Sequence, residues 1–159
     1  MEAAAATTAL TESMTVEPVG VVHSSFTDAQ TGREKRDFSR QEATIAVFPR
    51  FAEGLRGMDT LLGTTLVVCY RFHKTCDKPC SLFVRPHHDP ARKPRGVFAT
   101  NSNRRPNSIG LCCVTLLAVD YDAATITVRG LDAVDGSPVL DIKLHACCAL
   151  PAAPQAATD

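Results

Sequence analysis

Tryptophan is absent from this 159-residue chain, and only 6% of its residues are aromatic. A buried core must therefore rest on Val, Leu, Ile, Ala and Cys. The formal net charge at pH 7 is +0, which argues against nucleic-acid binding through overall charge but allows a local basic face. No apolar run approaches the roughly 18 residues that a membrane-spanning helix needs, so we expect no membrane partner.

The seven cysteines are an odd number, and the first residues lack the basic and apolar segments of a secretory signal. We therefore expect reduced thiols and a cytoplasmic location instead of a disulfide framework. Composition predicts a disordered N-terminal tail over residues 1–16 and a disordered C-terminal tail over residues 151–159. Residues 17–150 then form one domain, long enough to bury its own core.

Short β-type segments dominate the domain, and turn residues separate them. The predicted strands are residues 19–26, 43–48, 64–72, 81–86, 109–119, 125–129 and 139–143. One short helix is predicted over Pro49–Gly57, because it begins with Pro and ends with Gly. This pattern predicts a mainly β barrel or sandwich with one or two short helices. Without a βαβ unit, a doubly wound nucleotide-binding fold is excluded.

An unusual polar stretch interrupts two apolar runs in Gly96–Leu111, which reads GVFATNSNRRPNSIGL. A loop of this kind presents Arg, Asn and Ser donors at the edge of a rigid sheet, where binding sites are often built. Arg104 and Arg105 can each hold a phosphate or carboxylate through two hydrogen bonds. A solvated hairpin loop is the alternative interpretation of the same residues.

Three further stretches accompany this loop: Pro18–Ser24, Phe48–Leu55 and Asp132–His145, the last reading DAVDGSPVLDIKLH. Together, and in this order, the four stretches resemble the TsaA-like (TrmO-type) family of S-adenosylmethionine-dependent tRNA methyltransferases. The resemblance implies a single-domain TsaA-like β-barrel that works as a homodimer and binds S-adenosylmethionine. It also implies tRNA as partner, with methylation at N6 of threonylcarbamoyl-adenosine next to the anticodon.

The resemblance also implies which positions bind the cofactor, with Leu111 against the adenine. They are Thr65, Asn101, Arg105, Pro106, Asn107, Leu111, Asp132, Ala133, Val134, Asp135 and Gly136. The catalytic residue is unknown, and the candidates are Asp135, Asp141 and Lys143. A turn-forming role is the alternative for Asp135, and a cross-strand ion pair is the alternative for Asp141 and Lys143.

A basic cluster flanks the expected pocket and is a candidate surface for tRNA phosphates. It consists of Arg95, Arg104 and Arg105, with Arg92 and Lys93 beside them. A charged, solvated rim is the alternative interpretation of these residues.

Some family positions are changed in this chain. Asn101 stands where the family has Arg, and Gly63–Thr65 stands where it has Phe-Ser-His, so a guanidinium and an imidazole are missing. The family's Pro-x-Gln element has no clear match, with Gln30 and Gln41 as candidates, and its Pro-Tyr is Leu144-His145 here. These changes favour an alternative function: a catalytically impaired TsaA-like binding module for nucleotide or RNA.

Cysteine and histidine also suggest a metal hypothesis. Cys76, Cys80, His87 and His88 are the right residue types for a four-ligand zinc loop. A single cysteine pair with a three-residue gap is less diagnostic than Cys-x2-Cys, so we expect no metal. The neighbouring thiols of Cys112-Cys113 and of Cys147-Cys148 should point to opposite faces of a strand as small apolar residues.

Overall fold

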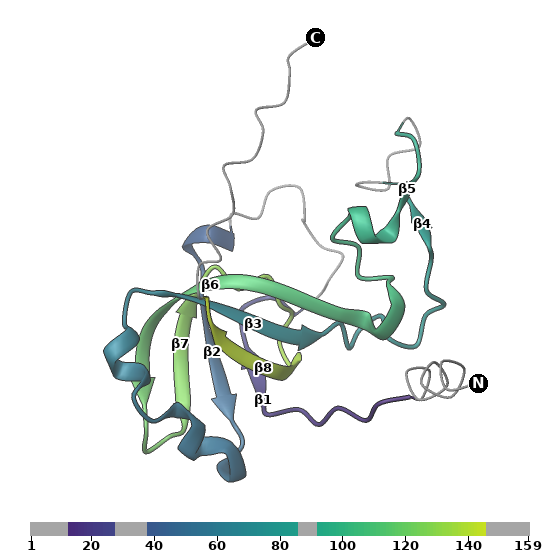
Figure 1. The fold of residues 1–159 in the computed structure, drawn as a ribbon. Helices are drawn as coiled ribbons and strands as arrows, with labels where there is room; N and C mark the ends of the chain where they lie inside the picture. The colour runs from purple at the N-terminus through teal and green to yellow at the C-terminus, as the bar shows by residue number, and fades with distance from the viewer. Residues whose placement is uncertain (1–12, 28–37, 86–91, 146–159) are drawn as a thin grey trace, which may run out of the picture.

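Alternating apolar and polar residues place one face of each long strand inside a closed antiparallel barrel (Figure 1). The computed structural model describes residues 13–27, 38–85 and 92–145. Six strands follow one another around the barrel: β1 (Gly20–His23), β2 (Glu42–Val47), β7 (Thr125–Arg129), β6 (Ile109–Asp120), β3 (Thr65–Arg71) and β8 (Pro138–Leu144). The pairing of Gly20 with Val139 closes the barrel. The predicted mainly β barrel is confirmed.

The core lies inside the barrel and consists of inward-facing aliphatic side chains. In β3, for example, Leu66 and Val68 are 1% and 0% exposed, whereas Val67 between them is only partly covered. Two core residues, Leu131 and Ala133, come from the connection between β7 and β8. We name residues 130–137 the closing loop, because its apolar side chains fill one end of the barrel.

A small hairpin stands away from the barrel (Figure 1) and pairs β4 (Phe83–Val84) with β5 (Arg95–Gly96). The strand predicted over residues 81–86 is therefore wrong in length and does not join the barrel; Pro86 lies outside the described residues. The pairing ends because β5 turns at once into the 3-10 helix η6 (Val97–Ala99). A two-residue strand such as Arg95-Gly96 carries no periodic pattern, and it was not predicted.

Helical structure is limited to 3-10 turns within the described part of the chain. The segment predicted as a helix over Pro49–Gly57 forms η3 (Pro49–Leu55), and η4 (Met58–Leu61) follows it. Gly57 separates the two at φ +84°, a conformation that favours glycine. The remaining turns are η2 (Phe38–Arg40) and η7 (Pro106–Ser108). None of the helices in the described residues has the length and apolarity to cross a membrane.

The other strand boundaries agree with the predictions to within a few residues. The first strand ends three residues earlier than predicted, at His23, because the Ser24 hydroxyl accepts a hydrogen bond from the Phe26 N–H and the chain turns. Most of the two predicted tails lies outside the described residues, so the limits of the domain stay a prediction.

Candidate functional site

Two side chains from inside the barrel hold the backbone of the closing loop. The hydroxyl of Tyr70, a residue only 3% exposed, donates to the Asp132 carbonyl at 2.5 Å. The Cys112 thiol donates to the Gly130 carbonyl at 3.2 Å, and its sulfur accepts the Asp132 N–H at 3.5 Å. Burial raises the pKa of the Cys112 thiol, so the thiol stays protonated and can donate. Side chains of the barrel interior thus bind three consecutive peptide groups of the loop, from the Gly130 carbonyl to the Asp132 carbonyl.

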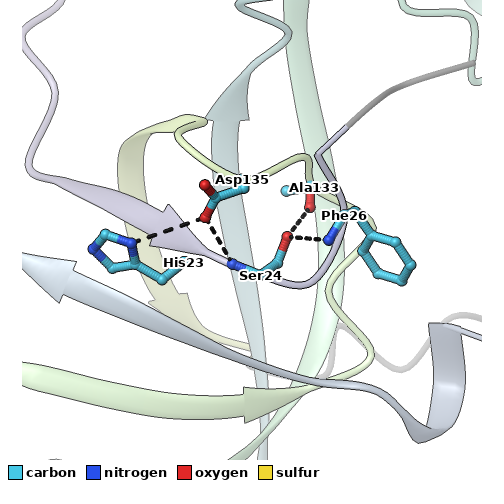
Figure 2. A network of polar contacts seen from close by, with 5 residues as sticks. All are labelled: His23, Ser24, Phe26, Ala133 and Asp135. Atoms are coloured by element: carbon cyan, nitrogen blue, oxygen red, sulfur yellow. Dashed lines mark hydrogen bonds and ion pairs between the residues drawn. The ribbon is translucent and has the colours of Figure 1, made fainter.

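The far side of the closing loop is tied to the end of β1 through Asp135 (Figure 2). Asp135 Oδ1 accepts the Ser24 N–H at 3.0 Å and lies 3.9 Å from Nδ1 of His23. The Ser24 hydroxyl donates in turn to the Ala133 carbonyl at 3.0 Å. These bonds join two segments 111 residues apart in sequence. Asp135 therefore does more than shape its own Asp-Gly turn.

A third contact comes from His73, two residues beyond the end of β3. Its Nδ1 lies 3.3 Å from the hydroxyl of Ser137, which is 2% exposed. Burial lowers the pKa of His73, Lys74 lowers it further by repulsion, and Asp135 opposes both effects. The imidazole is therefore mainly neutral at neutral pH and pairs with a neutral hydroxyl.

Residues 100–108, here named the arginine loop, lie within the predicted stretch Gly96–Leu111. Arg105 donates from its guanidinium to the Thr100 carbonyl at 3.2 Å, so this half-buried side chain closes its own loop. Asn107 and Ser108 both have positive φ, +64° and +52°. Asn adopts this conformation readily, but for Ser it is strained, and such strain tends to gather at functional sites.

The segment after Tyr70 brings the two loops together. The Phe72 N–H donates to the Ser108 carbonyl at 2.8 Å, and Oγ1 of Thr75 donates to the Asn103 carbonyl at 3.4 Å. Both acceptors belong to the arginine loop, while Tyr70 and His73 contact the closing loop. The C-terminal end of β3 therefore connects the two stretches that the motifs singled out, and the loops lie at the same end of the barrel.

Leu111 lies on the outer wall of the barrel at this same end. It is 69% exposed and opposes Cys69 in the register of β3 and β6, while Asp141 opposes Cys69 from the other side. Burial raises the pKa of the Cys69 thiol, and the Asp141 charge adds to the rise. Leu111 and Asp141 thus flank one thiol, adjacent in sequence to Tyr70.

The ion-pair alternative for Asp141 and Lys143 is not supported. Lys143 opposes Val67, and the Asp141 carboxylate accepts the N–H of the next residue, Ile142, at 2.9 Å. No ion pair of either residue occurs within the described ranges. The cause is geometric, since the partners that β3 offers these two side chains are Val67 and Cys69.

Thr65 is not brought to the other predicted residues. It lies at the start of β3, opposite Thr115, five residues and therefore about 17 Å from Tyr70 along the strand.

Asn101 and Asp132 are exposed at the loop end. Of the basic cluster, the exposed side chains are Arg92, Lys93, Arg95 and Arg104.

The proposed zinc ligands are only partly described. The Cys76 thiol donates to the His73 carbonyl at 3.2 Å, and Cys80 is exposed. His87 and His88 lie outside the described residues, as do Gln30, Cys147 and Cys148. Across the described ranges, no three His, Cys, Asp or Glu side chains gather as a metal site, and all five cysteines there are free.

Several contacts of the two loops were not predicted from the sequence. Tyr70 follows the inward alternation of β3, so nothing in the sequence separates it from an ordinary core residue. Cys112 and Cys113 do lie on opposite faces, half-buried and exposed, but Cys112 binds the closing loop in addition to packing. Ser24 belongs to the stretch Pro18–Ser24 that resembles the family. Beside it, Gln41 accepts a hydrogen bond from Ser25 at 3.4 Å.

Comparison with known proteins places these features in one family. The family model described as the tRNA-methyltransferase O N-terminal domain matches residues 21–148. An S-adenosyl-L-methionine-binding protein of Archaeoglobus fulgidus is 40% identical over 133 residues, which cover 83% of this chain and 89% of that protein. A crystal structure of TrmO superposes with a TM-score of 0.69 at 29% identity, covering 91% of this chain and 64% of that one.

Other relatives are much longer than the matching region. A tRNA (adenine(37)-N6)-methyltransferase of Homo sapiens is 33% identical over 138 residues, 84% of this chain but 30% of that protein. A probable S-adenosyl-L-methionine-binding protein of Archaeoglobus fulgidus is 39% identical over 125 residues, 79% of this chain but 32% of that protein. The chain thus spans about a third of the length of these two relatives.

Proposed function

We propose, because this chain belongs to the tRNA-methyltransferase O N-terminal domain family, that it is an S-adenosylmethionine-dependent tRNA methyltransferase. The specific reaction we propose is methylation of N6 of threonylcarbamoyl-adenosine next to the anticodon. We further propose that the protein acts as a homodimer in the cytoplasm, where its free thiols stay reduced. One observation carries the proposal: the closing loop and the arginine loop meet at the C-terminal end of β3.

The residues at this end fit the chemistry of S-adenosylmethionine. The exposed Leu111 offers an apolar surface to the adenine ring. Carboxylates at Asp132 and Asp135 suit ribose hydroxyls or a sulfonium cation, which they attract electrostatically. The remaining proposed contacts come from the two loops: Asn101, Arg105, Pro106, Asn107, Ala133, Val134 and Gly136. Thr65 stays a proposal without a geometric argument, since it lies at the other end of β3.

When bound, S-adenosylmethionine supplies a methyl group on a positively charged sulfur, which departs as a neutral thioether. The chain therefore needs little acid–base chemistry, and its main task is to hold the acceptor nitrogen in line. That nitrogen loses one proton overall. Asp135, Asp141 and Lys143 remain the candidates to receive it; of these, the carboxylates of Asp135 and Asp141 lie at the loop end.

The tRNA would lie against the exposed cations beside the arginine loop. Arg95 and Arg104, with Arg92 and Lys93, are exposed and can neutralise phosphates. Arg105 is half-buried, and its guanidinium binds the Thr100 carbonyl. We therefore propose that Arg105 shapes the loop as well as contacting RNA or cofactor.

Two measurements test the proposal in sequence. Calorimetric titration with S-adenosylmethionine should give saturable binding, and transfer of a labelled methyl group should occur to tRNA that carries threonylcarbamoyl-adenosine. The same tRNA without that modification should accept no label. Absence of cofactor binding at millimolar concentration, with folded protein, would refute the enzyme. Labelling of the unmodified tRNA would refute only the specific substrate. Sedimentation checks the dimer.

A catalytically impaired binding module is the alternative function. It is favoured by Asn101, which has no guanidinium to offer, and by the distance of Thr65 from the loop end. Such a module would bind tRNA or nucleotide without transferring a methyl group. Retained tRNA affinity, combined with no bound S-adenosylmethionine, would decide for it.

A further inference from the structure

We propose that Tyr70 and Cys112 are positioning residues that set the orientation of the closing loop toward the cofactor. The inference rests on the proposed function, because it assigns these two side chains a role in S-adenosylmethionine binding. Neither side chain needs to touch the cofactor. Both act through the backbone of Asp132, whose carbonyl and N–H they bind.

Side-chain packing fixes the depth of the closing loop but not its orientation. Leu131 and Ala133 are 2% and 3% exposed and enter the core, while Asp132 between them is exposed. Two apolar anchors at alternate positions do not by themselves fix the peptide planes between them. Directional hydrogen bonds remove that freedom, and both backbone groups of Asp132 have one.

The two donors are themselves held firmly. The Tyr70 ring packs edge-on against Phe72, with ring centroids 5.3 Å apart, and Gly110 leaves no free space beside it. Cys112 also binds the Gly130 carbonyl, so its sulfur bridges two peptide groups of the loop. A rigid donor transmits its position to the loop, which is the requirement for a preorganised binding surface.

Tyr70→Phe is the decisive variant, and the chain offers a matched control. Its only other tyrosine, Tyr121, donates to Asp59 at 2.5 Å far from the loops, so Tyr121→Phe removes the same group elsewhere. We expect Tyr70→Phe to raise the Kd for S-adenosylmethionine about tenfold and Tyr121→Phe to leave it within twofold. Affinity for tRNA should be unchanged in both. An unaltered Kd in Tyr70→Phe, or an equal loss in Tyr121→Phe, overturns the assignment.

A spectroscopic measurement separates positioning from general destabilisation. The chain has no tryptophan and two tyrosines, so in Tyr121→Phe the tyrosine emission comes from Tyr70 alone. Because the loop is already preorganised around the hydroxyl, cofactor binding should leave this emission nearly unchanged. A large change that saturates at the Kd found by calorimetry shows that the bond between Tyr70 and Asp132 rearranges on binding, and it counts against the proposal.

Cys112 is tested by a pair of substitutions. Cys112→Ser keeps a group that can accept the Asp132 N–H and donate to the Gly130 carbonyl, and it should hold the Kd within about threefold, whereas Cys112→Val removes both functions and should raise the Kd about fivefold. The double variant Tyr70→Phe/Cys112→Val should lose less affinity than the product of the single effects, since both donors restrain one loop. Equal affinity in the Ser and Val variants removes Cys112 from the proposal.

The outcome also separates this inference from the function on which it rests. If the wild-type protein binds no S-adenosylmethionine, the proposed function fails and the assignment fails with it. If the wild type binds and Tyr70→Phe binds equally well, only the positioning role fails. Circular dichroism and thermal unfolding of each variant establish that the compared proteins are folded.

Discussion

The two ends of the barrel use the same kinds of side chain for different purposes. At the loop end, buried Tyr70 binds a backbone carbonyl, and Asp135 binds an N–H 111 residues away. At the opposite end, Tyr121 is 49% exposed and binds a side-chain carboxylate, and Asp120 binds the N–H of Ala123 within its own turn. The loop end thus fixes loop backbone through long-range bonds, whereas the other end has one bond between side chains 62 residues apart and one bond within a turn.

Among the substitutions that test this comparison, Gly110→Ala should have the largest effect. A Cβ atom at Gly110 would lie 2.7 Å from the Tyr70 ring and 2.9 Å from the Phe72 ring, both of which connect to the loops. We expect a loss of about 2 kcal/mol in the free energy of unfolding, the usual cost of overpacking a core. Binding of S-adenosylmethionine should weaken with it, because the Tyr70 hydroxyl is displaced.

The matched control for this substitution is Gly54→Ala, in η3. A Cβ there meets nothing within 4 Å, so unfolding in urea should change by less than about 0.5 kcal/mol. Cofactor affinity should not change. If Gly110→Ala unfolds at the wild-type urea concentration, the close packing around Tyr70 is not rigid, and the contrast between the two ends is lost.

The second test compares two aspartates that accept backbone N–H groups at similar distances, 3.0 Å for Asp135 and 2.9 Å for Asp120. Asp135→Ala and Asp120→Ala should each cost about 1 kcal/mol in unfolding free energy. Only Asp135→Ala should also weaken binding of S-adenosylmethionine, by about tenfold, because it removes the side-chain bond between the closing loop and Ser24 while the backbone bonds to β1 remain. Similar affinity in both variants would show that the Asp135 bridge only stabilises the fold.

The contrast between the ends also explains what the sequence could predict. The sequence predicted a strand over residues 64–72, and in the structure the alternate residues Leu66 and Val68 of β3 are buried, since one face of the strand lines the core. The same alternation conceals the role of Tyr70, because an inward tyrosine fits the core pattern whether or not its hydroxyl has a partner. That partner, Asp132, is 62 residues away. Long-range bonds of this kind leave no trace in local spacing.

The resemblance assigned the two site loops to one cofactor site, but it did not identify the residues that connect them. The residues that connect them, Phe72, His73 and Thr75, fall in a segment with no matching motif. Thr65 is the opposite case, since the fold separates it from the loop-end residues with which the motif grouped it. A motif position carries no information about which end of a strand the fold will present, so Thr65 was grouped with residues from which it is separated.

A smaller effect is expected from His73 as pH falls. Because burial lowers the pKa of His73 in the folded protein below its ordinary value of 6.5, the unfolded chain binds a proton that the folded chain excludes. This contribution to stability is fully present above pH 6.5 and is lost as the pH falls through the folded pKa. Lys74 and Asp135 act on the same imidazole in opposite directions.

Substitution His73→Gln should therefore flatten the pH dependence of the unfolding free energy just below pH 6.5. The control is His145→Gln, since His145 is exposed next to the start of β3, at the other end. That variant should keep the wild-type slope. Urea unfolding at a series of pH values gives both slopes, and an unchanged slope in His73→Gln would rule out this histidine as the source.

The smallest expected effect is on the affinity for tRNA, and it is tested by substituting Arg104 and, as a control, Arg56. Arg104 is exposed beside the arginine loop, whereas Arg56 forms an exposed ion pair with Glu53 at 2.7 Å in the η3 region. If tRNA phosphates lie against the loop end, Arg104→Ala should weaken tRNA binding about threefold at moderate salt and reduce the salt slope of log Kd by about 1. Arg56→Ala should change neither the affinity nor the salt slope, because the Arg56 guanidinium lies away from the loops.

A reduced salt slope in Arg104→Ala with unchanged S-adenosylmethionine affinity would separate RNA contact from cofactor contact. Equal slopes in the two variants would place the RNA on another face and leave the loop end to the cofactor alone.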